Sequence, residues 1–286
     1  MAEWFLYLPQ SRLAIAELVE RSQAAEASGF DGVAFLDHLE TPMAPESPIW
    51  EAMTIATWVA AHTETIRLGH LVLCDVFRQP AVLAKQAVTL AEASGGRFEL
   101  GLGSGSMPAE LAKFNLSTAG PVSRVDALGE TLAALTNYWG TGDRPDAVQV
   151  PTPGAPIPIM LGGTGPRMLK LVAKYADWWN LPATKVDQIE KYLPSIGSAQ
   201  ASVQQMVAFV RAGQDRDSIL EKGRRRFGHL GPGLAGGDAA QLITYFGNLE
   251  RRGAQRFYVW FADFAPVDTI IEFGETVIRP YGGFRA

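Results

Sequence analysis

Short apolar runs alternate with longer amphipathic stretches along almost the whole chain. The runs have the length of buried strands, and in the stretches between them apolar side chains recur every three or four residues, as on one face of an α-helix. The expected strands are residues 4–8, 32–36, 66–74, 97–102, 157–161, 178–181, 203–210 and 256–261. The expected helices are residues 15–27, 49–62, 80–94, 124–138, 166–175, 239–252 and 269–278, with Ser123 and Asp238 as N-caps of two of them.

The segment of residues 65–105 shows most clearly how these elements are connected. An apolar run ends at Cys74, a helical pattern follows from Pro80, and Gly95 ends that helix. A second apolar run then leads into the glycine-serine loop of residues 103–106. Two strands joined by a helix of this length pair in parallel, so the segment is a βαβ unit. Ligands of parallel folds bind at the carboxyl ends of the strands, which are Cys74 and the glycine-serine loop here.

Eight strands in alternation with helices, in a chain of 286 residues, are typical of a (β/α)8 TIM barrel. We therefore predict a single α/β domain with this fold over residues 1–286. A doubly wound open sheet is the alternative, but it usually has fewer strands at this length. Residues 140–156, rich in proline and glycine, and residues 211–237, charged and then glycine-rich, depart from the alternation. Both are expected to be long loops, which commonly form lids or substrate walls.

Composition and charge narrow the class of protein. A hydrophobic content of 47% and a charged content of 19% describe an ordinary globular chain. The formal net charge of −5 argues against a nucleic-acid binder, which would carry a basic face. The densest basic run, residues 224–226, is expected in a solvated loop. The alternative is that it binds a phosphate or an anionic tail.

The single cysteine and the apolar runs indicate the cellular compartment of the protein. Cys74 excludes an internal disulfide and fits a reducing cytoplasm. The first ten residues lack the pattern of a signal peptide, and no apolar run approaches the roughly twenty residues that span a bilayer. We expect a soluble cytoplasmic protein that acts on a small molecule, without nucleic-acid or membrane partners. A homodimer is compatible with the sequence.

His38 is the strongest candidate for acid–base chemistry. It follows Asp37 at the expected carboxyl end of the second strand, where barrel enzymes place catalytic groups. Histidine exchanges protons near neutral pH, and the alternative is a histidine that hydrogen-bonds the loop backbone. His62 ends a helix, His70 lies inside a strand and His229 lies in a loop, so they are weaker candidates. The chain has no His-x-His pair and no cysteine cluster, so we predict no metal site.

A glycine-rich turn joins the fifth strand to the following helix. It reads Gly162-Gly163-Thr164-Gly165 and is followed by Pro166, which fits the first helical turn. Glycines let backbone N–H groups approach a phosphate, and the helix N-terminus adds positive partial charge. A tight turn without a ligand is the alternative, but the position at a strand's carboxyl end favours anion binding.

Several ordered motifs resemble the luciferase-like oxidoreductases. They are IRLG, FRQPAVLAKQAVTL and SGGRFELGLGSG within residues 66–105, DGVAFLDH at 31–38, and PIMLGGTGPRMLKLVAKYADWWN at 158–180. With the last helix–strand pair, the resemblance covers most of the chain. It implies a TIM barrel, FMN or the deazaflavin coenzyme F420 as cofactor, and an active-site role for His38 near the flavin ring. It also implies that Gly162, Gly163 and Thr164 hold the cofactor phosphate.

The resemblance implies further cofactor contacts at two strand ends. In several relatives the third strand carries a bulge and a non-prolyl cis peptide that supports the ring system. We therefore expect Leu71, Val72 and Cys74 at the cofactor, with the irregular bond between Leu71 and Val72. The thiol of Cys74 is expected to be a small buried apolar group, with its backbone facing the ring. Ser104 and Gly105, after the fourth strand, complete the expected cofactor-binding set.

Strand alternation predicts charged groups inside the barrel. Along the fourth strand the apolar residues occupy the helix-facing side, so Arg97 and Glu99 should point inward, and Arg67 should do so on the adjacent strand. A buried ion pair is expected, since an unpaired internal charge is very costly. Trp178 and Trp179 end the sixth strand, where a pocket wall and core packing are equal alternatives.

We predict an oxidoreductase that uses F420 or FMN for hydride transfer or monooxygenation on a small, relatively apolar substrate, with His38 as proton or hydrogen-bond donor. A non-catalytic flavin-binding barrel is the alternative. A cofactor-free lyase is disfavoured, because no lysine falls clearly at a strand end. Sugar-phosphate dehydrogenases of the resembled family carry a glutamate directly after the fourth-strand glycine loop, where this chain has Ser106, followed by Met107 and Pro108. We therefore expect an apolar pocket with His38 as its main titrating group.

Overall fold

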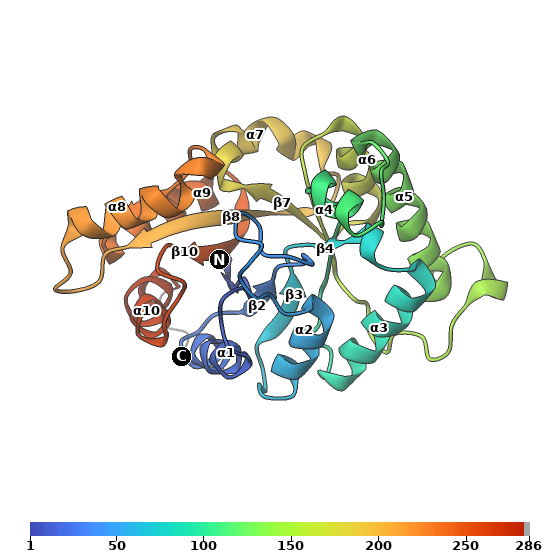
Figure 1. Ribbon diagram of the computed structural model, residues 1–286, viewed down its shortest axis with the longest axis horizontal. Helices are drawn as coiled ribbons and strands as arrows, with labels where there is room; N and C mark the ends of the chain where they lie inside the picture. Colours follow the sequence, from blue (N-terminus) through green and yellow to red (C-terminus); the bar gives the residue numbers. More distant parts are fainter. Residues whose placement is uncertain (283–286) are drawn as a thin grey trace.

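In a computed structural model that describes residues 1–282, parallel strands form a barrel surrounded by helices (Figure 1). The order around the sheet is β3-β2-β1-β10-β8-β7-β6-β5-β4, and a bridge between Leu68 and Phe98 joins its two ends. The TIM barrel is therefore confirmed, and the open-sheet alternative is wrong. The strands are β1 (Glu3–Tyr7), β2 (Gly32–Phe35), β3 (Arg67–His70), β4 (Leu73–Cys74), β5 (Leu100–Gly103), β6 (Ile159–Gly162), β7 (Trp178–Pro182), β8 (Gln200–Phe209), β9 (Ala235–Gly237) and β10 (Ala254–Phe261).

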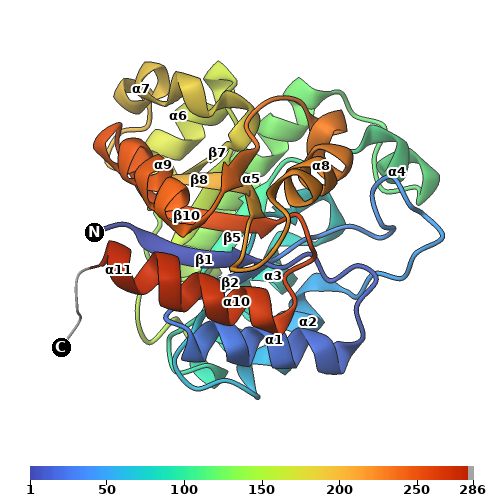
Figure 2. The ribbon, with the colours of Figure 1, turned by 90° about the vertical axis from the view of Figure 1, so that its left-hand side faces the viewer.

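Helices cover the outside of the barrel on all sides (Figure 1). Figure 2 shows the N-terminus and α11 on one side of the molecule and α4 on the other. No described helix is long and apolar enough to cross a membrane. The α-helices are α1 (Ile15–Ala27), α2 (Ala52–Ala60), α3 (Pro80–Ala93), α4 (Pro108–Lys113), α5 (Pro121–Tyr138), α6 (Pro166–Tyr175), α7 (Ile189–Tyr192), α8 (Arg216–Phe227), α9 (Ala239–Arg251), α10 (Val267–Phe273) and α11 (Arg279–Tyr281).

Apolar side chains fill two separate layers, because alternate residues of each strand face opposite sides of the barrel wall. The larger layer lies between strands and helices and includes Leu68, Leu100 and Phe257, all fully buried. The smaller layer fills the barrel interior. Its buried members are Phe5, Tyr7, Ala34, Leu71, Met160, Trp178 and Tyr258.

A buried ion pair crosses the barrel interior, as predicted, but with a different set of cations. Glu99 accepts hydrogen bonds from Arg256 of β10 at 2.5 and 3.0 Å and from Arg67 at 3.0 Å. Arg256 is fully buried and stacks on the ring of Trp178 at 3.7 Å. The inward position predicted for Arg97 is wrong, because its guanidinium bonds to backbone carbonyls of the loop before β3. Regular β5 begins three residues after Arg97, so strand alternation does not apply to it.

The third strand is interrupted where the resemblance implied. The peptide bond between Leu71 and Val72 is cis, and it separates β3 from β4. Together the two short strands form one element of the barrel wall. The predicted irregular bond is therefore confirmed at its predicted position.

Two helices differ from the sequence prediction. The N-cap of α5 is Gly120 and a proline occupies its first position, so the predicted cap Ser123 lies inside the first turn. Residues 211–237 are not one long loop, because they contain α8. Charged residues dominate α8, whose only buried residues are Gly223 and Phe227, so the helix lacks a clear apolar stripe. Residues 224–226 form the last turn of this helix, and their predicted loop position is wrong. Asp238, in contrast, caps α9 as predicted.

Candidate active site

A cleft of about 330 Å³ opens at the carboxyl ends of the strands. It lies among the ends of β1, β2, β4, β5, β6 and β8, with residues of α4 at one side. The sequence prediction named nine site residues, and seven of them line this cleft: His38, Leu71, Val72, Cys74, Ser104, Gly105 and Gly162. The other two, Gly163 and Thr164, lie next to the cleft in the loop that Gly162 begins.

A larger cavity of about 420 Å³ lies at the opposite end of the barrel. Trp4, near the start of β1, and Ile278 and Tyr281, near the end of the chain, contribute to its wall. Barrel enzymes carry their chemistry at the carboxyl ends of the strands, whereas the opposite end serves stability. The candidate site is therefore the smaller cleft.

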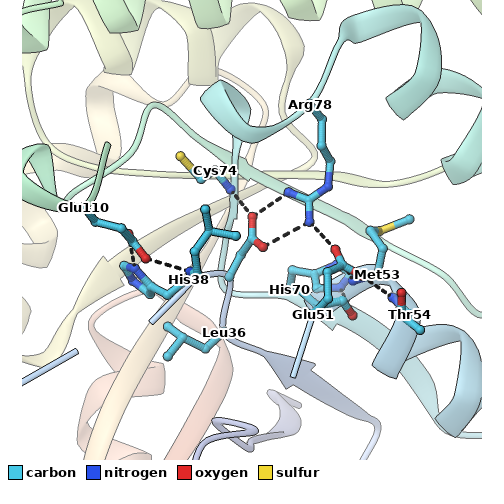
Figure 3. Close-up of polar contacts among 12 residues, drawn as sticks. Leu36, His38, Glu51, Met53, Thr54, His70, Cys74, Arg78 and Glu110 are labelled. Carbon is cyan, nitrogen blue, oxygen red and sulfur yellow. Dashed lines mark hydrogen bonds and ion pairs between the residues drawn. The ribbon is translucent and has the colours of Figure 1, made fainter. Parts of the chain in front are cut away.

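His38 is held by a buried carboxylate that the sequence analysis did not identify. Glu110 of α4 is 3% exposed, and its Oε2 lies 2.7 Å from Nδ1 of His38 (Figure 3). Its Oε1 accepts the backbone N–H groups of Leu39 at 2.6 Å and Glu40 at 3.2 Å. Within residues 1–282, no group hydrogen-bonds Nε2 of His38. Glu110 thus fixes the imidazole by one nitrogen and leaves the other for a ligand.

Asp37, the sequence neighbour of His38, has a structural role instead. Its carboxylate accepts the backbone N–H of Cys74 at 2.6 Å and binds Arg78 in bidentate fashion at 2.6 and 3.0 Å. Arg78 also donates to Glu51, the N-cap of α2, at 2.7 Å (Figure 3). Burial alone would lower the pKa of Arg78, but the two carboxylates outweigh it and raise that pKa. This network ties the ends of β2 and β4 together below His38.

Glycines at the base of the cleft leave room for the side chains of Val72 and Cys74. A Cβ atom at Gly103 would lie 2.6 Å from Cγ2 of Val72, and one at Gly105 would lie 3.0 Å from Sγ of Cys74. Gly105 also has φ +83°, a conformation that side chains disfavour. The base of the cleft is therefore backbone and small apolar side chains. Such a surface fits a flat ring system. The residues at the base of the cleft are therefore compatible with a bound flavin or deazaflavin.

Cys74 and Ser104 contribute packing and backbone more than reactive groups. Burial, the largest effect, raises the pKa of the Cys74 thiol to about 11, so it stays protonated at neutral pH. The prediction of an unreactive thiol agrees with this direction. The carbonyl of Ser104 accepts a hydrogen bond from Arg124 of α5 at 3.0 Å. That contact holds the loop after β5 in place.

The glycine-rich turn after β6 has a lysine beside it. Lys185 donates to Oγ1 of Thr164 at 2.7 Å, and within the described chain no carboxylate lies within ion-pair distance of its ammonium group. Gly163 has φ +115°, and its carbonyl accepts the indole N–H of Trp179 at 2.8 Å. The turn leads directly into α6, whose N-cap Gly165 offers no side-chain cap. Exposed N–H groups and a neighbouring cation suit an anion.

The two tryptophans of β7 belong to the core. Trp178 stacks on Arg256 inside the barrel, and Trp179 is fully buried on the helix side. Neither lines the cleft. Of the two alternatives left open by the sequence, core packing is therefore correct.

The expectation of a cleft with His38 as its main titrating group needs correction. Ser106 does occupy the position after the glycine loop, but Glu110, four residues later, brings a carboxylate into the cleft. Pro108 followed by Glu110 is a helix-start signal that could have predicted α4. That α4 turns its glutamate toward His38 depends on a contact between residues 72 positions apart, which no local pattern encodes.

The sequence profile of the luciferase-like monooxygenase family matches residues 5–219. That is more than half of the chain, and the chain therefore belongs to this family. The resemblance noted in the sequence motifs is confirmed, as is its implication of an enzyme fold.

Named relatives include enzymes that depend on F420. The chain is 31% identical to an F420-dependent hydroxymycolic acid dehydrogenase of Mycobacterium tuberculosis over 240 residues, which cover 80% of this chain and 63% of that protein. It is 28% identical to an F420-dependent glucose-6-phosphate dehydrogenase of Microbacterium testaceum, covering 71% of this chain and 61% of that protein. The chain thus spans less than two thirds of the length of these two relatives.

Solved structures of similar shape confirm the fold. An F420-dependent secondary alcohol dehydrogenase, solved with an F420–acetone adduct, matches with a TM-score of 0.84 at 18% identity over 99% of both chains. The monooxygenase RslO1 from Streptomyces bottropensis matches with a TM-score of 0.75 at 18% identity, covering 98% of this chain and 99% of that one. At this identity, the likeness concerns the fold alone.

Proposed function

We propose that this protein is an oxidoreductase that binds coenzyme F420, with FMN as the alternative cofactor, and acts on a small organic substrate in the cleft beside His38. The observation that carries the proposal is the cleft itself, which combines a backbone base with an anchored histidine at the carboxyl ends of the strands. The F420-dependent relatives favour F420 over FMN.

Different residues around the cleft would bind different parts of the cofactor. The backbone at Leu71, Val72 and Gly105 would support the ring system. The turn of Gly163 and Thr164, with Lys185 beside it, would bind the phosphate through N–H groups and an ammonium group. When bound, the cofactor supplies the redox chemistry, as a hydride acceptor or donor. The chain supplies the position of the cofactor and the histidine beside it.

His38 would move or hold the proton that accompanies the redox step. Its Nε2 is open to the cleft, and Glu110 at Nδ1 favours the tautomer or charge state with a proton on that nitrogen. A histidine held this way can accept a proton from a substrate hydroxyl or donate a hydrogen bond to a carbonyl oxygen. The geometry is therefore suited to interconversion of hydroxyl and carbonyl groups.

Cofactor titration of the purified protein tests the proposal. We expect saturable quenching of F420 fluorescence, with FMN binding more weakly. Stopped-flow mixing with candidate alcohols then separates an enzyme from a non-catalytic binding barrel, because only an enzyme changes the redox state of the bound cofactor. A protein that binds neither F420 nor FMN would overturn the proposal.

The remaining expectations of the sequence analysis accompany this proposal. We propose a cytoplasmic protein with a small-molecule substrate and without nucleic-acid or membrane partners. The single cysteine, which cannot form an internal disulfide, supports the cytoplasm, and the net charge of −5 argues against a nucleic-acid partner. Sedimentation of the purified protein distinguishes a homodimer from a monomer.

A further inference from the structure

Polar side chains inside the barrel are paired below the level of the cleft. The hydroxyl of Tyr258, which points inward from β10, accepts a hydrogen bond from Arg256 at 3.0 Å. Glu99 and Arg256 satisfy each other in the same layer. This pairing is the usual state of buried polar groups in proteins. A buried polar group that has no partner therefore requires an explanation.

Tyr7 is a largely buried residue of the interior layer whose hydroxyl has no protein partner within residues 1–282. It ends β1, is 3% exposed and lines the cleft. Among the residues that the structure describes, none hydrogen-bonds its hydroxyl, in contrast to Tyr258. Burial raises the pKa of Tyr7, so its hydroxyl is neutral and can donate a hydrogen bond at physiological pH.

Two neighbouring glutamines of β8 differ in the same way, because one has hydrogen-bond partners in the described part of the chain and the other has none. Gln205 faces the helices, where its amide donates to the carbonyl of Gly233 at 2.5 Å and accepts from the hydroxyl of Tyr245 at 3.0 Å. Gln204 faces the opposite side and lines the cleft. Within residues 1–282, its side-chain amide has no hydrogen-bond partner. Of these two glutamines, the one without a partner is the one that faces the cleft.

A third unpaired donor lies on the residue that packs against Tyr7. The ring of Trp260 meets the ring of Tyr7 edge to face at 5.3 Å, and its buried Nε1 has no partner in the described chain. Tyr7, Gln204 and Trp260 come from β1, β8 and β10, which are adjacent in the sheet. Tyr7 and Gln204 line the cleft and can donate a hydrogen bond to an oxygen atom there, whereas Trp260 packs against Tyr7 and does not line the cleft.

The carboxylates of the cleft already have partners within the protein. Glu110 is paired with His38 and Asp37 with Arg78. No lysine or arginine is among the described residues that line the cleft. A carboxylate or phosphate on the substrate would therefore lose its hydration without gaining a cation, which is costly. A neutral oxygen would lose much less.

We propose that Tyr7 and Gln204, with Trp260 packed against Tyr7, form the substrate-recognising side of the cleft and select a neutral alcohol or ketone by hydrogen bonds from Tyr7 and Gln204 to its oxygen. This inference rests on the proposed oxidoreductase function and names the substrate class of the same site. Tyr7 and Gln204 act in recognition, whereas His38 acts on the proton. A site built to hydrogen-bond a substrate oxygen discriminates by leaving its own polar groups unpaired when that oxygen is absent.

The test measures binding of three probes of equal ring size, cyclohexanol, cyclohexanone and cyclohexanecarboxylate, by calorimetry with and without saturating F420. We expect the wild-type protein to bind the two neutral probes at least tenfold more tightly than the carboxylate. Tyr7→Phe and Gln204→Met should each weaken binding of the neutral probes about three- to tenfold, the range of one neutral hydrogen bond. Tyr245→Phe is the matched control, because its hydroxyl bonds Gln205 outside the cleft, and it should bind the probes as wild type does.

Three outcomes would overturn the inference: a carboxylate bound as tightly as the ketone, neutral probes that do not bind, or both variants binding like wild type. Cofactor affinity is measured separately on each variant and should not change. A protein that binds cyclohexanone in a Tyr7-dependent manner but takes up neither F420 nor FMN would overturn the proposed function and leave the recognition role intact. Loss of cofactor binding in Tyr7→Phe would contradict the assignment to the substrate side.

Discussion

At the scale of single residues, the contact between Glu110 and His38 determines which nitrogen can act. Oε2 of Glu110 occupies Nδ1, while Oε1 holds the backbone of Leu39 and Glu40, so one carboxylate orients both the ring and the loop that carries it. Glu110 is thereby a positioning residue and His38 the catalytic candidate. The adjacent Asp37 cannot take this part, because Arg78 and the backbone of Cys74 use both of its oxygens.

His38→Ala should lower kcat about 10²-fold or more, because general acid–base groups contribute on that scale. Added imidazole should restore part of the rate if the lost group is a proton carrier. Ser106→Ala, which changes a hydroxyl in the same cleft, should change kcat little and serves as the control. An unchanged kcat in His38→Ala would remove His38 from the mechanism.

Glu110→Gln should lower kcat with little change in KM, since it removes the charge that orients His38 while its amide oxygen can still accept the backbone N–H groups. If Glu110 acts through His38, the double variant should be no slower than His38→Ala alone. Steady-state kinetics of the four proteins complete this cycle. Additive losses would show that Glu110 has an independent role.

At the scale of elements, the alternation of strands and helices could be predicted from the sequence, because burial on both faces makes parallel strands continuous apolar runs. The prediction failed where local pattern is weak. Helix α8 carries charged residues over most of its surface, and α4 is six residues long, too short for a period to show. Motifs at strand ends predicted residues that lie together at one cleft, but Glu110 meets His38 only through a contact between distant elements.

The turn between β6 and α6 gives a prediction at this scale. Gly163→Val should weaken F420 affinity, because φ +115° is strained for a side chain and an added Cβ would lie 3.2 Å from Cγ of Met168. Gly120→Ala is the control: it caps α5, its Cβ would meet nothing within 4 Å, and its φ is −67°. Both should keep the circular dichroism spectrum of the wild type. Equal F420 affinity in a titration of Gly163→Val and wild type would show that this turn does not bind the cofactor.

At the scale of the whole molecule, charges inside the barrel join distant parts of the chain. Arg256 near the carboxyl end of the sequence bonds Glu99 from the middle and Glu3 from the start, the latter at 2.6 Å. Burial alone would raise the pKa of Glu3, but Arg256 and Arg67 outweigh it and lower that pKa. The cluster therefore links β1, the segment before β5, and β10 around one guanidinium.

Glu99→Gln should lower the free energy of unfolding by about 1.5–3 kcal/mol, because Arg256 would lose its bidentate carboxylate and keep only Glu3 as an ion partner. The double variant Glu99→Leu with Arg256→Met should recover most of that loss, since Glu3 and Arg67 still pair with each other at 2.8 Å. Urea unfolding measures both. A double variant as unstable as the single one would mean that packing, and not the stranded charge, sets the cost.

The fully buried His70 of β3 should make the stability of the whole barrel depend on pH. Burial, the largest effect, lowers its pKa to about 4 from the usual 6.5, although a hydrogen bond from Nε2 to the carbonyl of Ala52 at 3.1 Å opposes it. The unfolded chain thus takes up a proton near pH 6.5, while the folded chain does so only near pH 4. Stability is full above pH 6.5 and is lost as the pH falls toward 4.

Urea unfolding at pH 7.5 and 5.0 should show a loss of about 2 kcal/mol that belongs to His70, because each pKa unit of difference corresponds to about 1.4 kcal/mol. His70→Gln keeps a donor for the Ala52 carbonyl but does not titrate. It should therefore lose less stability than wild type between the two pH values, by about the same 2 kcal/mol. The comparison cancels the contributions of other titrating groups, which are present in both proteins. Equal pH dependence in the two proteins would mean that His70 is protonated, or reached by water, in the folded barrel.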